Sequence, residues 1–192
     1  MMSIVPQIRI YAAIPLYMVR SFLAVPFHPD EDFLSIVNEV KENYGREVRI
    51  PDTSNMHITL DFFADITERQ ALERWENLNI RAFENSILSP TGIGHFPEGK
   101  KTRVLFLDLN RELFMKKDES IYLENKFSWS YSEFHPHVTI CRFKFPGDTL
   151  LLEEKYKNHS FKKQKSEKIM LIKSILGQSG PSYTILRETQ LI

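Results

Sequence analysis

The chain has little of what would mark a secreted, membrane or broadly charged protein. It has one cysteine among 192 residues, Cys141, so no intramolecular disulfide can form and a secreted disulfide scaffold is excluded. Lys plus Arg and Asp plus Glu both number 25, so no net charge attracts the whole protein to nucleic acid or to an anionic membrane. We therefore expect a cytoplasmic protein, without a membrane partner, that binds any anionic ligand locally.

The N-terminal segment lacks a complete targeting signal. Gln7 and Arg9 interrupt its apolar residues and Pro6 breaks its helix, so neither a signal peptide nor a membrane span is expected. We expect residues 1–17 to be a poorly ordered extension, with a translation start at Met18 as the alternative. Apolar residues make up 42% and charged residues 26%, as in ordinary globular proteins, so residues 18–192 are expected to form a single domain and a monomer.

Apolar periodicity and turn residues predict short strands mixed with helices. Short Gly- and Pro-rich connections at 97–103 and 177–181 favour hairpins, and GIGHFP at 92–97 is interpreted as a turn. The expected fold class is therefore α+β with mostly antiparallel sheets. Strands are predicted at 20–25, 56–63, 86–88, 103–109, 136–143, 168–175 and 182–187, and helices at 29–44, after a capping box at 67–70, at 110–126 and at 148–156.

A four-residue pattern, His-x-Thr-aliphatic, occurs twice, as HITL from His57 and as HVTI from His137. Alternate residues of a strand point to the same face, so each histidine shares a face with the threonine two positions later. Thr59 and Thr139 are these threonines, about 7 Å along the strand from their histidines. The aliphatic residues between them anchor the opposite face in apolar packing.

Two imidazoles flanking two hydroxyls across a cleft suit phosphodiester cleavage. One neutral imidazole accepts a proton from water while the other, protonated, donates one to the leaving oxygen, and both states exist near neutrality. Threonine hydroxyls donate hydrogen bonds to phosphate oxygens. A single such tetramer is more often a half-buried strand segment, so the signal lies in the doubling.

Several segments together resemble the 2H phosphoesterase superfamily, and within it the RNA 2',3'-cyclic phosphodiesterases, formerly described as 2'-5' RNA ligases. The segments are RSFLAV, NMHITLDFFADI, GIGHFP, FHPHVTICRFK and GPSYTILRE. The resemblance implies two pseudo-symmetric α+β lobes of mostly antiparallel sheet, with flanking helices, around a central cleft within residues 18–192. It also implies hydrolysis of a terminal 2',3'-cyclic phosphate to a 2'-phosphomonoester without metal.

The resemblance further assigns roles to individual residues. His57 matches the proton donor to the leaving 3'-oxygen, and His137 matches the base that activates water. Thr59 and Thr139 match the phosphate-binding threonines, and Arg142 matches an arginine that helps to hold the phosphate. No metal ligand and no cofactor are implied.

Two neighbours of the motifs need a structural explanation. Strict strand alternation places Arg142 on the face opposite His137, so its phosphate contact requires a bulge or a strand end. The same alternation places Asp61 on the face of His57, where a carboxylate raises the pKa of the histidine or repels the phosphate. Cys141 stands where the family more often has alanine.

Other candidate residues have plainer readings. His135 and His95 are expected beside the cleft or in a loop, and without cysteine-containing ligand spacing a zinc site is not expected. The chain has no P-loop or GxGxxG, so no nucleotide cofactor is expected. A lysine-rich stretch is interpreted as a solvated face, with RNA contact as the alternative. An aromatic stretch is interpreted mainly as core, with one residue available to stack on a base. These stretches are Lys155, Lys157, Lys162, Lys163, Lys165, Lys168 and Lys173, and Phe127, Trp129, Tyr131 and Phe134.

The expected partners are RNA 3' ends or small nucleotide cyclic phosphates. A 2'-5' RNA ligase acting at the same site is an alternative enzyme. A module that binds RNA ends without turnover is the non-enzymatic alternative. Joining of RNA halves that bear cyclic phosphate and 5'-hydroxyl ends would identify the ligase, and stoichiometric binding without product would identify the binding module.

Overall fold

The computed structural model describes residues 18–99, 101–177 and 180–191. The predicted extension, residues 1–17, lies outside the described residues. Among the helices that the structure describes, none is long and apolar enough to cross a membrane.

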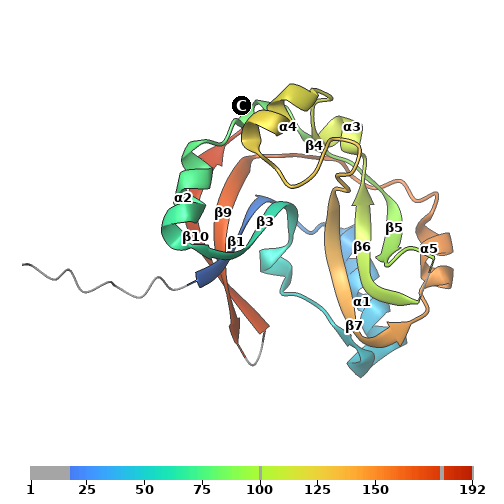
Figure 1. The fold of residues 1–192 in the computed structure, drawn as a ribbon. Helices are drawn as coiled ribbons and strands as arrows, with labels where there is room; N and C mark the ends of the chain where they lie inside the picture. The colour runs from blue at the N-terminus through green and yellow to red at the C-terminus, as the bar shows by residue number, and fades with distance from the viewer. Residues whose placement is uncertain (1–17, 100, 178–179, 192) are drawn as a thin grey trace, which may run out of the picture.

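Most of the strands form one antiparallel sheet, in the order β10-β9-β1-β3-β7-β6-β5, with β2 also paired to β7 (Figure 1). Two short strands, β4 and β8, form a second sheet. The α+β class with mostly antiparallel sheet is confirmed. The strands are β1 Met18–Pro26, β2 Val48–Arg49, β3 His57–Thr67, β4 Ile87–Leu88, β5 Pro90–Phe96, β6 Thr102–Leu109, β7 His137–Gly147, β8 Gln164–Lys165, β9 Lys168–Gly177 and β10 Gly180–Gln190.

The large sheet consists of two similar halves that meet at its centre. In one half β1 pairs with β3, and in the other β6 pairs with β7. The strand pairing follows the same register in both halves. The pair Phe22–Phe62 of the first half corresponds to the pair Val104–Arg142 of the second. We call the half with β1, β3, β9 and β10 lobe 1 and the half with β2, β5, β6 and β7 lobe 2.

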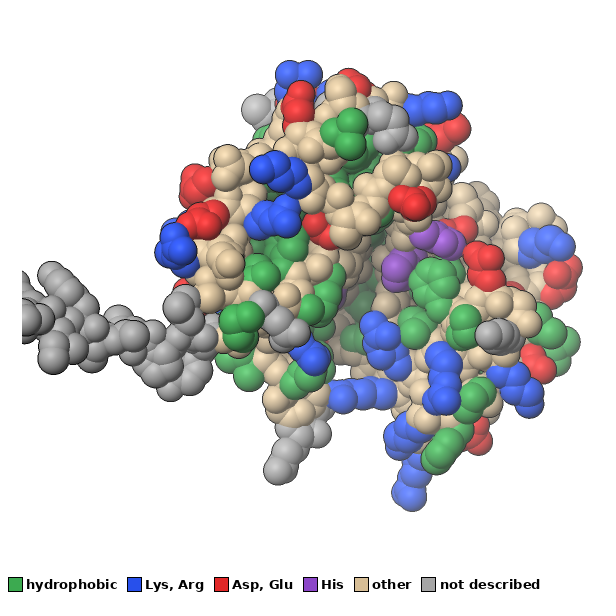
Figure 2. All heavy atoms as spheres, viewed as in Figure 1, with side chains coloured by type: hydrophobic (Ala, Val, Ile, Leu, Met, Phe, Trp, Pro, Cys, Tyr) green, Lys and Arg blue, Asp and Glu red, His purple; other side chains and the backbone are tan. Residues whose placement is uncertain are grey.

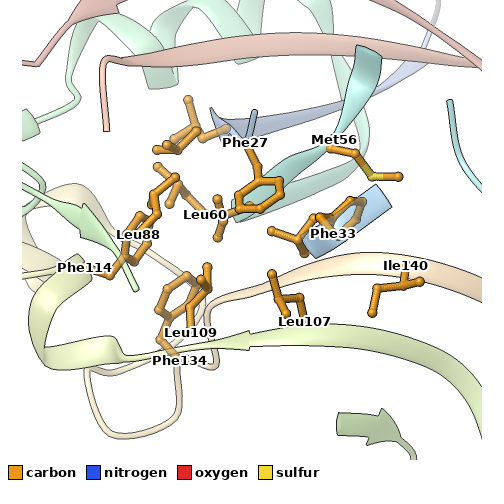
Figure 3. Packing of buried hydrophobic residues seen from close by; sticks show 14 of the residues in the cluster. Phe27, Phe33, Met56, Leu60, Leu88, Leu107, Leu109, Phe114, Phe134 and Ile140 are labelled. Atoms are coloured by element: carbon orange, nitrogen blue, oxygen red, sulfur yellow. The ribbon is translucent and has the colours of Figure 1, made fainter. Parts of the chain in front are cut away.

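The main core lies on one face of the sheet and draws on both lobes. Figure 3 shows Leu60 of lobe 1 and Ile140 of lobe 2 near Phe33, which belongs to α1. Helix α1 begins where the Asp30 carboxylate accepts a hydrogen bond from the Phe33 amide, and it buries one apolar stripe in this core. His57 lies on the opposite face of the sheet, where it stacks on Phe22 of a smaller buried cluster. The helices are α1 Glu31–Tyr44, α2 Glu68–Glu76, α3 Arg111–Phe114, α4 Glu119–Asn125 and α5 Leu150–Tyr156.

Three elements differ from the sequence expectations. The helix predicted at 110–126 is two short helices, because the side chains of Asn110 and Asp118 each cap a new helical start. The first five residues of GIGHFP lie in strand β5 rather than in a turn, and Gly94 leaves room there for the Phe106 ring of the adjacent strand. The segment predicted as a strand at 86–88 forms β4, which pairs with β8 instead of joining the hairpin with β6.

Candidate active site

The two His-x-Thr motifs begin the two strands that meet at the centre of the sheet. β3 and β7 are antiparallel, and Ile58 pairs with Val138. Continuing that register sets His57 across from Thr139 and Thr59 across from His137. Each histidine therefore lies beside the threonine of the other motif.

A β-bulge lies at the last residue of each motif. In β7 the pairing with β6 skips Ile140, and in β3 the pairing with β1 skips Leu60. A bulge shifts the alternation of the residues that follow it. Arg142 is therefore turned to the cleft, where it lines the same cavity as both histidines. The bulge that its predicted phosphate contact requires is present.

The expectation for Asp61 was wrong for the same reason. The bulge at Leu60 turns Asp61 into the interior, where it is 5% exposed and accepts hydrogen bonds from the Ser128 hydroxyl (2.9 Å) and the Phe62 amide (3.1 Å). Burial raises the pKa of the Asp61 carboxyl. Cys141 occupies the equivalent place in lobe 2, where burial raises the pKa of its thiol to about 12. Neither side chain reaches the cleft.

The two imidazoles are held in the same way. His57 Nδ1–H donates to the Asn55 carbonyl oxygen (2.7 Å), and His137 Nδ1–H donates to the His135 carbonyl oxygen (2.8 Å). A carbonyl oxygen only accepts, so these bonds assign the proton of each neutral ring to Nδ1. The Nε2 atom of each ring is left for a ligand in the cavity.

Aromatic rings surround both histidines. His57 stacks on Phe22 with ring centroids 4.9 Å apart, and Tyr183 meets it edge-on at 5.8 Å. His137 is bordered by Phe96 and Phe106 at 5.2 and 5.1 Å. Burial is the main cause that lowers the pKa of each imidazole, and the Arg142 charge lowers both further. Both rings are therefore biased toward the neutral form when the cavity is empty.

The motif residues share a cavity of about 370 Å³, within the range of small-molecule sites. Figure 2 shows a hollow between the lobes, with histidine side chains in it and Lys and Arg side chains gathered beside it. The cavity contains all five predicted site residues and extends beyond them over the segment before β3 and the start of β10. The lining residues are Arg49, Ile50, Pro51, Asp52, Asn55, Met56, His57, Thr59, His137, Thr139, Arg142, Pro181 and Tyr183.

Sequence reasoning missed two lining residues in particular. Arg49 comes from the two-residue strand β2, and it is paired with Arg142 on β7. Tyr183 comes from β10, at the far edge of the sheet in strand order. The only available signal for Tyr183 was its place in the GPSYTILRE segment, and Arg49 had none.

The remaining histidines lie outside the cavity lining. His135 Nε2 is 2.7 Å from an Asp108 carboxylate oxygen, and this hydrogen bond raises the pKa of His135. His95 Nδ1 is 2.8 Å from Glu153 of α5. Within residues 18–99, 101–177 and 180–191, no group of three or more His, Cys, Asp or Glu side chains lies close enough together to bind a metal ion.

The lysine-rich and aromatic stretches have structural partners. Four of the lysines pair with carboxylates, as Lys155 does with Glu39 at 2.8 Å, which favours the interpretation as a solvated face. Trp129 stacks between Phe127 and Phe134, with centroids 4.6 and 4.2 Å away. Its indole N–H donates to the Leu60 carbonyl oxygen (2.6 Å), so the aromatic stretch supports the strand of the first motif.

Comparison with solved structures confirms the fold. TT0787 of Thermus thermophilus aligns with a TM-score of 0.63 at 22% identity, covering 90% of this chain and 97% of that one. E. coli LigT complexed with 3'-AMP aligns with a TM-score of 0.60 at 18% identity, covering 91% and 99%. This chain therefore shares the fold of these proteins.

Sequence comparison gives the family. The RNA 2',3'-cyclic phosphodiesterase of Aquifex aeolicus is 34% identical over 171 residues, which cover 81% of this chain and 91% of that protein. No protein-family model matches the chain. The chain belongs to the RNA 2',3'-cyclic phosphodiesterase family and is a phosphoric diester hydrolase.

Proposed function

We propose that the protein hydrolyses the 2',3'-cyclic phosphate at RNA 3' ends to a 2'-phosphomonoester, by acid-base catalysis without metal. The observation that carries this proposal is the equivalent arrangement of two imidazoles in one cavity. Each has Nδ1 fixed by a backbone carbonyl and Nε2 free to exchange a proton with a ligand. The names of the similar proteins, a cyclic phosphodiesterase and a 3'-AMP complex, support the substrate class.

The proposed proton transfers follow from the two ring positions. Neutral His137 accepts a proton from the attacking water at Nε2, and protonated His57 donates its Nε2 proton to the departing 3'-oxygen. The donor and acceptor assignments come from the family resemblance. Bound phosphate raises the pKa of both rings, because a nearby anion stabilises an imidazolium. This offsets the desolvation that otherwise keeps His57 neutral.

Three further side chains are proposed to hold the phosphate. Thr59 and Thr139 donate hydroxyl hydrogen bonds to its non-bridging oxygens, and Arg142 supplies a fixed positive charge. Negative charge grows on these oxygens as water adds to phosphorus. Donors held in place before the reaction stabilise that charge without reorganising.

The test is hydrolysis of adenosine 2',3'-cyclic phosphate in EDTA by the wild-type protein, His57→Ala and His137→Ala. Loss of an acid or base costs roughly 10²–10⁴-fold in kcat, so both variants are expected to lose that much. His28→Ala is the matched control, because His28 is exposed and lies outside the cavity lining. Circular dichroism confirms that each variant is folded.

Product analysis distinguishes the proposal from its rivals. Phosphorus NMR of the product is expected to show a 2'-phosphate rather than a 3'-phosphate. Stoichiometric binding with no product would favour an RNA-end binding module, and joining of an added 5'-hydroxyl RNA would favour a ligase. Activity lost in EDTA and restored by a divalent metal would contradict the metal-free mechanism, and full activity in both histidine variants would overturn the acid-base roles.

A further inference from the structure

The cavity is larger than its catalytic centre requires. The histidines, threonines and Arg142 occupy one part, and the rest is lined by the segment from Arg49 to Met56 and by the start of β10. This second part has apolar lining from Ile50, Pro51 and Pro181. It also contains Arg49, a cation that the proposed chemistry does not use.

Arg49 and Arg142 are direct cross-strand partners on β2 and β7. Residues directly opposite in an antiparallel pair point to the same face, and both arginines line the cavity. Like charges in such positions destabilise a sheet. Two fixed positive charges on one wall of the cavity favour an anionic ligand there.

The two arginines have different surroundings. The Arg142 charge lowers the pKa of both His57 and His137. Burial raises the pKa of Tyr183, and the charges of Arg142 and of Arg49 oppose that rise. The guanidinium of Arg49 packs against Gly180, whose φ of +128° and lack of a Cβ leave it that space. Arg142 thus lies toward the catalytic histidines, and Arg49 lies toward the hairpin between β9 and β10.

The charge of the substrate suggests what Arg49 binds. A 2',3'-cyclic phosphate is a diester with one negative charge, which Arg142 and the threonine hydroxyls already meet. Asp52 also lines the cavity, where its Oδ1 accepts hydrogen bonds from the Ser54 amide and hydroxyl. In an RNA chain, the nearest other anion is the phosphate on the 5'-oxygen of the same terminal nucleotide.

The geometry points to Arg49 as the binding residue for the phosphate on the 5' side of the terminal nucleotide, so that the site prefers an RNA chain end to a free nucleoside cyclic phosphate. This inference rests on the proposed function. The terminal nucleoside would lie between the two arginines, against the apolar lining beside Tyr183. Recognition needs only a 5'-phosphate, whether it is a monoester or the diester that continues the chain.

The experiment compares two substrates that differ only in this anion: adenosine 2',3'-cyclic phosphate with a 5'-hydroxyl and the same compound with a 5'-phosphate. The measured quantity is the ratio of their kcat/KM values, which we call the 5'-phosphate gain. One charge-assisted hydrogen bond supplies roughly 10- to 100-fold, so we expect a gain of that size in the wild-type protein. In Arg49→Ala the gain is expected to fall to about one, and Arg49→Lys is expected to retain part of it.

Two reference variants separate this role from general electrostatics and from catalysis. Arg46→Ala removes an exposed cation three residues away that does not line the cavity, so it is expected to keep the gain. Arg142→Ala is expected to lower kcat/KM for both substrates by a similar factor and so to keep the gain. Circular dichroism of Arg49→Ala checks that the packing against Gly180 is not needed for folding.

Each other result counts against the inference. Equal losses on both substrates in Arg49→Ala would place Arg49 on the reacting phosphate. An equal fall of the gain in Arg46→Ala would show only long-range attraction, and a wild-type gain near one would exclude a 5'-phosphate site. If the wild-type protein hydrolyses neither compound nor an RNA with a 2',3'-cyclic phosphate end, the proposed function itself has failed, and this result is distinct from failure of the inference alone.

Discussion

The histidine environments set the pH range in which the proposed mechanism operates. Burial lowers the pKa of His57 and of His137 from the ordinary value of 6.5, so the empty site favours two neutral imidazoles. The mechanism requires one neutral and one protonated ring. The active protonation state is therefore most populated on the acidic side of pH 6.5.

We predict that kcat/KM, which reports the free enzyme, is maximal below pH 6.5 and falls as the pH rises. The fall on the alkaline side follows from loss of the His57 proton, and the fall on the acidic side from protonation of His137. The kcat profile, which reports the bound complex, is expected to shift to higher pH because phosphate stabilises both imidazolium ions. A kcat/KM maximum well above pH 6.5 would contradict these assignments.

At the residue scale, the sequence was sufficient where the signal was local and repeated. His57 and Thr59 are two positions apart on one strand, and strand periodicity alone places them on one face. Arg49 and Tyr183 could not be found in this way. Each enters the cavity through strand pairing over long sequence separations, and β2 has only two residues to mark it. The 5'-phosphate site inferred above consequently depends on the structure.

At the element scale, the bulges decide which residues face the cleft. Strict alternation gave the wrong face for Asp61 and for Arg142, because each follows a bulge that sequence periodicity does not reveal. The bulge occurs in both lobes, but the residue that it turns toward the cleft differs. At the position equivalent to cationic Arg142, lobe 1 has Phe62, which is 53% exposed. The bulges thus repeat the backbone arrangement while the side chains make the two lobes unlike.

The buried position of Asp61 gives a stability prediction. Its pKa is raised above the unfolded value near 3.8, so the folded state binds the proton more tightly and stability is lost as the pH rises through the folded pKa. Asp61→Asn keeps an oxygen for the Ser128 and Phe62 donors without a buried charge. We expect it to be more stable than the wild-type protein at pH 7, with a difference that shrinks toward pH 4, as chemical denaturation at several pH values would show.

Asp61→Ala is the matched contrast. It leaves the hydroxyl of Ser128 and the amide of Phe62 without this acceptor, and an unsatisfied buried polar group costs roughly 1–3 kcal/mol. A loss of stability is therefore expected at all these pH values. Equal destabilisation by Asn and Ala would show that the Asp61 carboxylate is favourable in its buried site.

At the scale of the whole molecule, one core serves both lobes. Val25 and Leu60 of lobe 1 belong to the same buried cluster as Leu107 and Ile140 of lobe 2, and Phe33 of α1 lies within it (Figure 3). Between β3 and β7 themselves, the recorded pairing is Ile58 with Val138. The lobes thus depend mainly on shared packing, which supports the proposal that residues 18–192 are a single bilobal domain.

A shared core predicts that the two lobes unfold together. The two tryptophans occupy different positions. Trp75 lies on α2, which follows β3 of lobe 1, and Trp129 precedes β7 of lobe 2 but donates its indole N–H to Leu60 of lobe 1, so that it reports the junction of the lobes. Trp75→Phe and Trp129→Phe each leave one fluorescent reporter. Within each variant, urea denaturation followed by tryptophan fluorescence and by far-UV circular dichroism is expected to give one midpoint, as in a two-state transition. Separate midpoints in either variant would mean that the lobes are independent folding units.

A substitution where the lobes meet tests the same point. If the domain is a single unit, Ile58→Ala should lower the free energy of unfolding of the whole domain by roughly 2–5 kcal/mol, because Ile58 is fully buried there. If the lobes are independent, Ile58→Ala should destabilise one lobe alone.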